Sequence, residues 1–286
     1  MKICLACGQH YQKVDWSCPF CGWTPSQRLG FLSFAPNISA EKAGFNPDLF
    51  GQLMEIEERH FWFRSRNRLL NWALKTYFPD TRNLLEIGCG TGFVLLGLRT
   101  AFPCLDLTGS DVFCEGLEFA KRVPNVTLLQ IDARQIPFEN EFQIVGAFDI
   151  LEHIDEDDVV LRQMYQATSP GGGIIVTVPQ HRFLWSGFDV FSGHQRRYVR
   201  KELEEKIERA GFRVVRTTSF VFFLLPLILV VRLLEKRKAR DVTVEFKVLP
   251  VLNACLEHIL RFEQFLIRIG VSLPFGSSLM IIARKG

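Results

Sequence analysis

The sequence predicts an α/β fold in which a Rossmann-like, mostly parallel sheet with an antiparallel last strand carries helices on both faces, preceded by a small cysteine-rich module. Three observations predict it. Apolar strand-like segments alternate with amphipathic helix-like segments, which favours parallel strands joined by crossover helices. A glycine-rich loop stands between the first of these strands and a helix. Four cysteines lie in two pairs within the first 21 residues.

The composition fits a globular protein with a substantial core. Of the 286 residues, 48% are hydrophobic and 23% are charged, which suits one large domain with a small appendage. The net charge of +3 is too small to indicate a nucleic-acid-binding protein by itself. Because the chain starts with no long apolar run, we expect no signal peptide, a cytoplasmic location and reduced thiols. Paired cysteines are then candidate metal ligands rather than disulfides.

The cysteine pairs define the first of three regions. Their spacing, C-x2-C-x10-C-x2-C, resembles a zinc ribbon, in which two knuckles present four thiolates to one tetrahedral zinc ion. The expected ligands are Cys4, Cys7, Cys18 and Cys21. Four thiolates leave no open position, so the zinc is expected to be structural and to stabilise a module, residues 1–24, that is too short to form its own core. Residues 25–48 contain three prolines and little periodicity, and are predicted to be a linker to the main domain, residues 49–286.

Apolar periodicity assigns the elements of the main domain. Apolar positions three and four residues apart predict helical structure from Asp48 to about Phe78, where Pro79 ends it. Apolar runs bounded by glycine, proline or polar residues predict strands, and Gly211 is expected to close the helix before it. The remaining segments, in chain order, are strand Asn83–Gly88, helix Gly92–Ala101, strand Leu105–Asp111, helix Glu115–Arg122, strands Val126–Ile131 and Phe142–Ile150, helix Glu156–Thr168, strand Gly172–Val178, helix Lys201–Ala210, and strands Phe212–Thr218 and Ser278–Arg284.

The glycine loop, residues 86–92 with the sequence E-I-G-C-G-T-G, is the first candidate binding site. Glycine lets the backbone approach a ligand closely, and the N-terminus of the following helix offers unpaired N–H groups. A dinucleotide-binding loop requires G-x-G-x-x-G, and Phe93 occupies the position of its third glycine. Asp111 ends the second strand about 20 residues further on, where an acid binds ribose hydroxyls. Asp132 follows the third strand and is placed to accept a hydrogen bond from an adenine amino group.

Together these residues resemble the class I S-adenosylmethionine (SAM)-dependent methyltransferases, over about residues 50–286. The sequence looks closest to the branch that acts on small molecules, quinones and lipids, because Leu151-Glu152-His153 follows the fourth strand. That strand begins Phe142-Gln143 where the family usually has Phe-Asp, so one acidic group is missing. The resemblance implies SAM as the cofactor. The residues expected to bind it are Glu86, Gly88, Cys89, Gly90, Gly92, Asp111, Val112, Asp132, Ala133 and Asp149.

The candidate catalytic residues follow the fourth strand or lie in a basic loop. Methyl transfer to a hydroxyl needs a base, and histidine, with a pKa of about 6.5, is the usual choice. His153 and His194 are the candidates, and Glu152 would orient one of them or hold a divalent cation. Residues expected to cover the site or contact the acceptor are His60, Trp62, Phe63, Arg64, Arg197 and Tyr198. The alternative for the histidines and aromatic residues is an ordinary packing, capping or surface role.

Residues 220–275 interrupt the alternation before the last strand. The apolar run Phe220–Val231 is too short to span a membrane, which takes about 20 residues, and it contains Pro226. The basic side chains that follow it suit an anionic bilayer surface; they are Lys236, Arg237, Lys238 and Arg240. We expect a helical excursion, with a second helix at about Leu249–Ile269, that touches a membrane through residues 220–240 or encloses a lipidic acceptor. A hairpin packed on the sheet or in a dimer interface is the alternative.

The sequence therefore predicts a SAM-dependent methyltransferase of a small or lipid-linked acceptor, most simply at oxygen. One alternative is an RNA or protein methyltransferase that binds its substrate through the ribbon, and another is a SAM-binding adaptor without turnover. The ribbon region carries few basic residues (Lys2, Lys13, Arg28), which argues against nucleic acid as the partner. A docking or homodimer surface is equally open. Because acceptor sites in this fold come from variable insertions, the fold does not identify the acceptor.

Overall fold

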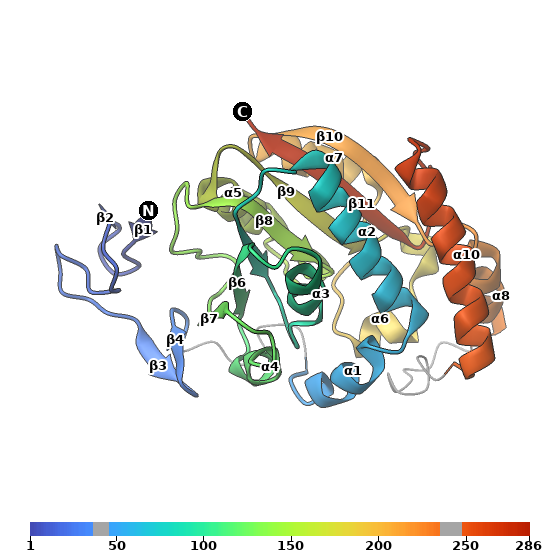
Figure 1. Ribbon diagram of the computed structural model, residues 1–286, viewed down its shortest axis with the longest axis horizontal. Coiled ribbons are helices and arrows are strands. Elements are labelled where there is room, and N and C mark those ends of the chain that lie inside the picture. Colours follow the sequence, from blue (N-terminus) through green and yellow to red (C-terminus); the bar gives the residue numbers. More distant parts are fainter. Residues whose placement is uncertain (37–45, 235–247) are drawn as a thin grey trace.

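The computed structural model describes residues 1–36, 46–234 and 248–286 (Figure 1). A nine-stranded sheet forms its centre, with the strand order β10-β11-β9-β8-β5-β6-β7-β4-β3. The strands are β3 (Ser26–Arg28), β4 (Phe31–Ser33), β5 (Asn83–Ile87), β6 (Asp106–Asp111), β7 (Val126–Gln130), β8 (Phe142–Phe148), β9 (Thr168–Pro179), β10 (Phe212–Phe220) and β11 (Ser278–Lys285). The strands from β4 to β9 in this order pair in parallel, whereas β11 is antiparallel to β9 and β10, and β3 to β4. The predicted fold class is confirmed.

The course of the chain through the sheet reverses at β5. The next two strands, β6 and β7, extend the sheet on one side of β5, and β8 and β9 extend it on the other. These five strands are parallel, so their carboxyl ends lie along one edge of the sheet. A reversal of this kind separates the connections that leave the central strands and opens a crevice at that edge, where ligands bind in open α/β sheets.

Helices cover both faces of the sheet and bury one apolar core on each. The first core lies under α2 (Phe61–Tyr77), α3 (Phe93–Ala101) and α4 (Cys114–Ala120). The second core lies under α5 (Asp157–Ala167) and α7 (Arg200–Arg209). The central strand β5 is buried from Leu84 to Ile87, as expected for a parallel strand covered on both faces. Gly211 follows α7 with φ of +109°, which confirms it as the closing residue of that helix.

The helical region expected from Asp48 to Phe78 is two helices. The first, α1, spans Leu49–Glu57, and α2 begins at Phe61. His60 ends the break between them in an extended conformation, and its side chain accepts a hydrogen bond from the backbone N–H of Trp62 at 3.2 Å. The side chain thus caps α2 and fixes the angle at which the chain enters it.

The segment predicted as a linker, residues 25–48, is a linker only in part. Its first half forms the hairpin of β3 and β4, and β4 pairs in parallel with β7, so the large sheet gains two strands at this edge. Phe31, Ser33 and Phe34 are buried there. The sequence signal was missed because each strand has three residues, too few for a periodic pattern. Residues 37–45 lie outside the described residues.

The N-terminal module packs on the same edge of the sheet. Its two short strands, β1 (Lys2–Ile3) and β2 (His10–Tyr11), form an antiparallel pair. Trp16 packs edge-on against Phe34 and Phe138, with ring centroids 4.5 and 5.4 Å away. The backbone N–H of Ile3 donates to the carbonyl of Pro137 at 3.0 Å. The module therefore lies at the opposite end of the sheet from α8 and α10 (Figure 1).

The interruption at residues 220–275 contains two helices, α8 (Leu225–Leu234) and α10 (Pro250–Arg268). In Figure 1, α10 lies beside α2. Polar contacts join the two helices: Arg68 donates to the carboxylate of Glu257 at 2.7 Å, and the amide of Gln264 donates to the carbonyl of Ser65 at 2.7 Å. The predicted basic flank, Lys236 to Arg240, lies outside the described residues. No helix in the described part of the chain is both long enough and apolar enough to span a membrane.

A buried carboxylate fixes the start of this excursion. Glu263 of α10 is 1% exposed and accepts hydrogen bonds from the backbone N–H groups of Val221, Phe222 and Phe223 at 2.6, 2.6 and 3.1 Å. Burial raises the pKa of Glu263, so the three N–H groups are what make its ionised form tolerable. Glu263 therefore connects α10 to the turn that leads from β10 into α8.

We expect Glu263→Ala to lower the free energy of unfolding by about 3 kcal/mol, because three backbone N–H groups would lose their acceptor in a buried turn. Urea unfolding monitored by circular dichroism measures it. The control is Glu208→Ala on the exposed side of α7, which should change the free energy of unfolding by less than about 0.5 kcal/mol. Equal effects of the two substitutions would contradict this assignment.

Candidate active site

A cavity of about 770 Å³ opens at the carboxyl edge of the central strands. The glycine loop after β5, the end of β6 and the turn after β8 form one side of it. The start of α2 and the apolar face of α8 form the other side. The cavity thus lies at the strand reversal described above, where the fold predicts a ligand.

The glycine loop needs glycine at its turns. Gly88, Gly90 and Gly92 have φ of +69°, +50° and +76°, a left-handed region that strains any residue with a Cβ. A Cβ on Gly88 would also lie 2.6 Å from the side chain of Ile150, and one on Gly92 would lie 2.9 Å from Ala120. Gly88, Cys89 and Gly90 line the cavity. Gly92, also predicted to bind the cofactor, is not among the described residues that line the cavity; it starts α3 and lets that helix pack against α4.

Asp111 ends β6 with its carboxylate held by the loop beside it. Its two oxygens accept hydrogen bonds from the backbone N–H groups of Gly90 at 2.8 Å and Phe113 at 2.9 Å. Burial raises the pKa of Asp111 to about 6, although these bonds oppose the rise. Each oxygen keeps a further lone pair, and the residue lines the cavity. This is the arrangement expected of an acid that accepts bonds from two ribose hydroxyls.

Buried acids surround the same half of the cavity. Glu86 is 2% exposed, and one of its carboxylate oxygens has no hydrogen-bond partner among the described residues. Burial raises the pKa of Glu86 well above its usual value. Burial also raises the pKa of Glu57, which accepts a bond from the hydroxyl of Thr91. Such a site favours a cationic ligand, because a positive charge offsets the cost of burying carboxylates.

Two more predicted acids follow the strands β7 and β8. Asp132 lines the cavity with Val112 and Ala133, and its carboxylate is bonded on both oxygens by Arg134 at 3.0–3.1 Å. Asp149 follows β8 with φ of +57°. Its carboxylate accepts bonds from Arg66 and from the hydroxyl of Thr177, the latter at 3.1 Å. Both acids therefore reach the cavity already paired.

A polar centre lies beyond Asp149, and the sequence predicted all three of its residues. Glu152 and His153 belong to the short turn η2 (Leu151–His153), and His194 follows α6 (Gly187–Phe191). One ligand atom from each of the three residues lies within 4.8 Å of the others. The rings of His153 and His194 meet edge to face, with centroids 4.7 Å apart. All three residues line the cavity.

Asp189 fixes the orientation of His194 in this centre. It is fully buried, and it accepts hydrogen bonds from Nδ1 of His194 at 2.9 Å and from Arg197 at 2.7 and 3.0 Å. Burial opposes ionisation, but the bond from His194 and the charge of Arg197 hold the pKa of Asp189 below its usual range. An Nδ1–H bonded to Asp189 leaves Nε2 of His194 as a lone-pair donor. Arg197, expected to contact substrate, lines the cavity with its charge already paired.

A family model described as a methyltransferase domain matches residues 54–217, more than half of the chain. The chain belongs to the methyltransferase domain family. The resemblance drawn from the sequence is thereby confirmed.

The individual proteins that this chain resembles are distant in sequence. The ubiquinone/menaquinone biosynthesis C-methyltransferase of Desulfotalea psychrophila is 26% identical over 129 residues, which are 44% of this chain and 50% of that protein. The ubiquinone biosynthesis O-methyltransferase of Pseudomonas putida is 27% identical over 112 residues, 37% of this chain and 47% of that protein. The chain spans about half the length of the curated relatives that it matches.

Solved structures support the fold of this methyltransferase domain. A chain from the complex between the Haloferax volcanii Trm112 methyltransferase activator and a putative methyltransferase aligns with a TM-score of 0.53 at 15% identity, over 83% of this chain and 96% of that chain. Haemonchus contortus phosphoethanolamine N-methyltransferase 2, in complex with S-adenosyl-L-methionine, aligns with a TM-score of 0.52 at 22% identity, over 77% of this chain and 52% of that chain.

The segment expected to cover the site does lie over it. His60, Trp62 and Phe63 line the cavity from the start of α2. Burial lowers the pKa of His60 to about 4, which keeps its ring neutral as a helix cap. Arg64, predicted with them, lies elsewhere. Its side chain pairs with Glu257 of α10 at 3.4 Å, and it is not among the described residues that line the cavity.

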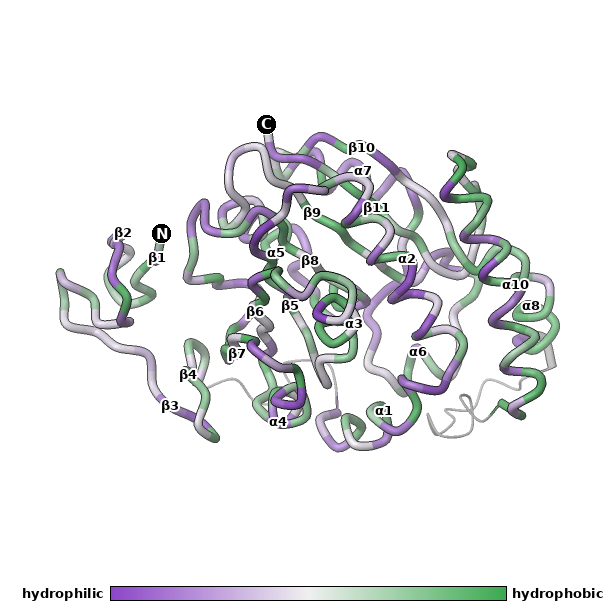
Figure 2. The backbone as a smooth tube through the Cα atoms, in the orientation of Figure 1, coloured by the Kyte–Doolittle hydropathy of each residue, from purple (hydrophilic) through white to green (hydrophobic). Residues whose placement is uncertain are grey.

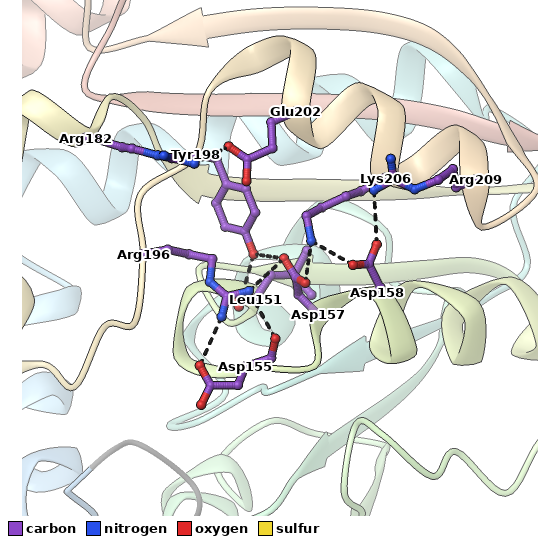
Figure 3. A network of polar contacts seen from close by, with 10 residues as sticks. All are labelled: Leu151, Asp155, Asp157, Asp158, Arg182, Arg196, Tyr198, Glu202, Lys206 and Arg209. Atoms are coloured by element: carbon purple, nitrogen blue, oxygen red, sulfur yellow. Dashed lines mark hydrogen bonds and ion pairs between the residues drawn. The ribbon is translucent and has the colours of Figure 1, made fainter.

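Tyr198 also lies elsewhere. We expected it to contact substrate, but it is fully buried, and its hydroxyl donates to the carboxylate of Asp157 at 2.7 Å (Figure 3). Lys206 donates to the same carboxylate at 2.7 Å, and Arg196 pairs with it at 3.1 Å. This network joins α7, the loop before it and the start of α5 behind the polar centre, so Tyr198 supports the site without lining it.

The outer half of the cavity is apolar except for Arg232. The side chains that α8, the turn before it and α10 contribute to the lining are Val221, Leu224, Leu227, Ile228, Val231, Arg232 and Leu256. Figure 2 shows the hydrophobic character of α8. The predicted excursion therefore forms a wall of the site as well as packing on α2.

Four cysteine sulfurs meet at the other end of the molecule. One sulfur from each of Cys4, Cys7, Cys18 and Cys21 lies within 4.8 Å of the others, as a zinc ribbon requires. Gly8 and Gly22 follow the two knuckles with φ of +74° and +73°. This confirms the predicted ribbon as a cluster of four thiols.

Sequence reasoning missed two charged residues of the site. Arg66 lines the cavity, pairs with Asp149 and lies with its guanidinium carbon 4.9 Å from the ring centroid of Trp62. It stands four residues after Trp62, one turn along the same helix face, and that spacing was the available signal. Asp189 lies in the capping box that begins at Ser186. The box was visible in the sequence, but its contact with His194 was not.

We expect SAM affinity to fall as the pH drops below about 6. The predicted bonds from ribose hydroxyls need the ionised carboxylate of Asp111, and burial raises the pKa of this group to about 6, so below that pH binding would have to displace a proton. The affinity then falls by up to about tenfold per pH unit. Calorimetric titration with SAM between pH 5 and 8 measures it.

Asp111→Asn should weaken binding and flatten the pH dependence. Asp106→Asn, at the exposed start of the same strand, should leave both unchanged. An unaltered pH dependence in Asp111→Asn would contradict the role given to this carboxylate.

Proposed function

We propose that this protein is a SAM-dependent methyltransferase whose acceptor is a small or lipid-linked molecule with an apolar part, methylated at oxygen. The observation that supports it is one continuous cavity, with the glycine loop and Asp111 in one half, apolar side chains of α8 in the other, and the polar centre among its lining residues. Family membership supports the methyl donor, and the apolar lining supports the class of acceptor.

The inner half fits SAM by the chemistry of its residues. Gly88, Cys89 and Gly90 offer a close backbone surface, and Asp111 would accept bonds from the ribose hydroxyls. One carboxylate oxygen of Glu86 has no partner among the described residues, which suits the positive ammonium group of the donor. When bound, SAM supplies an electrophilic methyl group on a sulfonium. The task of the chain is to align the acceptor with that methyl group at about 3–3.5 Å.

The outer half fits an acceptor with a hydrocarbon portion. Leu227 and Ile228 of α8 line it, and burying such a portion contributes about 25 cal/mol per Å² of apolar surface. Two relatives are named for ubiquinone or menaquinone biosynthesis, which is consistent with a lipid-like acceptor here.

The proton of an acceptor hydroxyl would leave toward the polar centre. His194 is oriented by Asp189 so that Nε2 carries the lone pair, and the ring of His153 packs edge-on against it. As a base, His194 would remove the proton while the new bond to carbon forms, and the imidazolium would be stabilised by Asp189. The assignment of His153 or His194 as the base is part of this proposal.

Two partner predictions remain proposals. Apolar side chains on the outer faces of α8 and α10 are exposed, among them Val230, Phe262 and Phe265 at 52%, 54% and 56%. They support peripheral contact with a membrane through this end of the molecule. The same exposed faces would suit a homodimer, which analytical ultracentrifugation decides.

We expect radiolabelled SAM to transfer its methyl group into the lipid fraction of a cell extract. Ile228→Asp should reduce transfer at least tenfold while SAM affinity stays unchanged, because the charge would enter the apolar half of the cavity. The control is Val230→Asp, an exposed position on the same helix outside the cavity lining, assayed with detergent-solubilised acceptor. Label in the RNA or protein fraction would point instead to a macromolecular acceptor. SAM binding with no label in any fraction would point to an adaptor without turnover.

We also propose that the four-cysteine cluster holds one structural zinc ion. Cys7→Ser should lower the zinc content by one ion per chain and reduce thermal stability, because a module this short depends on its metal. Mass spectrometry of the metal content measures it, and Cys104→Ser, an exposed cysteine outside the cluster, is the control. Unchanged zinc in Cys7→Ser would refute the assignment.

A further inference from the structure

The polar centre contains a buried carboxylate that the site leaves unsatisfied. Glu152 is fully buried, and neither of its carboxylate oxygens has a hydrogen-bond partner among the described residues. Its backbone is fixed, since the N–H of Gln195 donates to the Glu152 carbonyl at 2.7 Å. A buried carboxylate without a partner costs several kcal/mol. Such a group points to a missing positive ligand or to a proton.

The surroundings of Glu152 supply nitrogen ligands. Ring nitrogens of His153 and His194 and a carboxylate oxygen of Glu152 lie within 4.8 Å of one another. Ligands of one tetrahedral zinc ion, with bonds of about 2.1 Å, lie about 3.4 Å apart. Side-chain movements of roughly an ångström would therefore bring the three atoms to one ion.

The hydrogen bond that His194 makes on its other ring nitrogen is of the kind that metal-binding histidines usually make. Nδ1 of His194 donates to the buried carboxylate of Asp189 at 2.9 Å, and a carboxylate in this position fixes the ring and raises the basicity of the other nitrogen. Asp189 is in turn held by Arg197 and by the backbone N–H of Ser186. With the hydroxyl of Ser186, which donates at 2.9 Å, five donor contacts at this fully buried residue give His194 one defined orientation.

The pairing of the charged side chains around Glu152 favours the binding of a cation. Arg197 pairs with Asp189, and Arg66 pairs with Asp149, so each nearby guanidinium already has its counter-ion. Among the described residues, neither carboxylate oxygen of Glu152 has a partner. Two neutral imidazoles and one carboxylate then present a net charge of −1 to an incoming ion.

We propose that Glu152, His153 and His194 bind one divalent transition-metal ion, with its remaining coordination positions open to the cavity. Two imidazoles and a carboxylate suit zinc, iron(II) or manganese(II), and three protein ligands are the number that leaves an open position for an oxygen of the substrate. This second site is chemically distinct from the four-thiol cluster at the other end of the molecule.

The role of this ion rests on the proposed methyl transfer, whereas its binding does not. A hydroxyl of the acceptor bound at an open position would lose its proton to water more readily. The oxygen would then form the new bond to the methyl carbon, while the carbon–sulfur bond breaks and sulfur keeps its electron pair. In this scheme His153 and His194 are ligands rather than bases.

Manganese binding to the chain prepared with one equivalent of zinc, enough for the four-thiol cluster alone, tests the site, and a separate sample prepared with excess zinc serves the second readout. Mn²⁺ prefers carboxylate and imidazole to four thiolates, so the loss of the free Mn²⁺ paramagnetic resonance signal reports on this centre. Zinc content by mass spectrometry is the second readout, with a second zinc per chain expected beyond the ribbon. Glu152→Gln and His194→Ala should each weaken Mn²⁺ binding at least tenfold and remove the second zinc. His181→Ala, a half-buried histidine on the loop after β9, is the matched control.

The outcomes separate this inference from the proposed function. One ion per chain that is lost in both variants and kept in His181→Ala supports the site. Binding of neither metal, or binding that survives Glu152→Gln and His194→Ala, overturns it and leaves Glu152 as a protonated acid with His194 as the base. SAM titration of the same variants is independent. SAM binding without metal binding would refute the metal site alone, and failure to bind SAM would refute the proposed function.

Discussion

The site depends on burying acids at the carboxyl edge of a parallel sheet. Parallel strands bring their last residues to one edge, and the reversal at β5 leaves that edge open between the connections. The acids gathered there are Glu57, Glu86, Asp111, Asp149 and Glu152. Arg66 pairs with Asp149, and backbone N–H groups hold Asp111, but Glu86 and Glu152 keep unpartnered oxygens among the described residues. Burying these carboxylates therefore costs free energy in the folded chain, and a positively charged ligand would lower that cost.

Glu86 and Glu152, the two acids with unpartnered oxygens among the described residues, lie in different parts of the cavity. Glu86 lies beside the glycine loop, where the donor would place its positive ammonium and sulfonium groups. Glu152 lies beside two histidines, where the acceptor oxygen would arrive. This separation would let one cavity hold a charged donor and a polar reacting atom while the rest of the proposed acceptor meets hydrocarbon.

In the proposed function, the parts that would surround the donor come from the sheet, and the parts that would surround the acceptor come from additions to it. The α8 wall is carried by α10, which is held to α2 through Arg68 and Glu257 and to the β10–α8 turn through Glu263. The cysteine module packs on the opposite edge, beside the β3–β4 hairpin that widens the sheet. Acceptor recognition can thus vary in the α8–α10 excursion without disturbing the donor site.

The sequence by itself determined the fold class, the glycine loop, the four-thiol cluster and the residues of the polar centre. These follow from local rules: alternating apolar runs, glycines at left-handed turns, and a fixed spacing of cysteines. The same local patterns also predicted ligand contacts for Gly92 and Tyr198, because spacing along the chain does not say which side of a turn faces a cavity. Gly92 faces α4 and Tyr198 faces Asp157.

Only the tertiary structure decided which distant residues meet. The contacts of His153 with His194, of Arg66 with Asp149 and of Glu263 with the turn before α8 join segments that no periodicity links. The β3–β4 hairpin was invisible for the same reason: its strands are stabilised by pairing with β7 and each other rather than by their own pattern. Whether a buried carboxylate is paired or left open to a ligand is likewise a property of the packed molecule, because it depends on every neighbour at once.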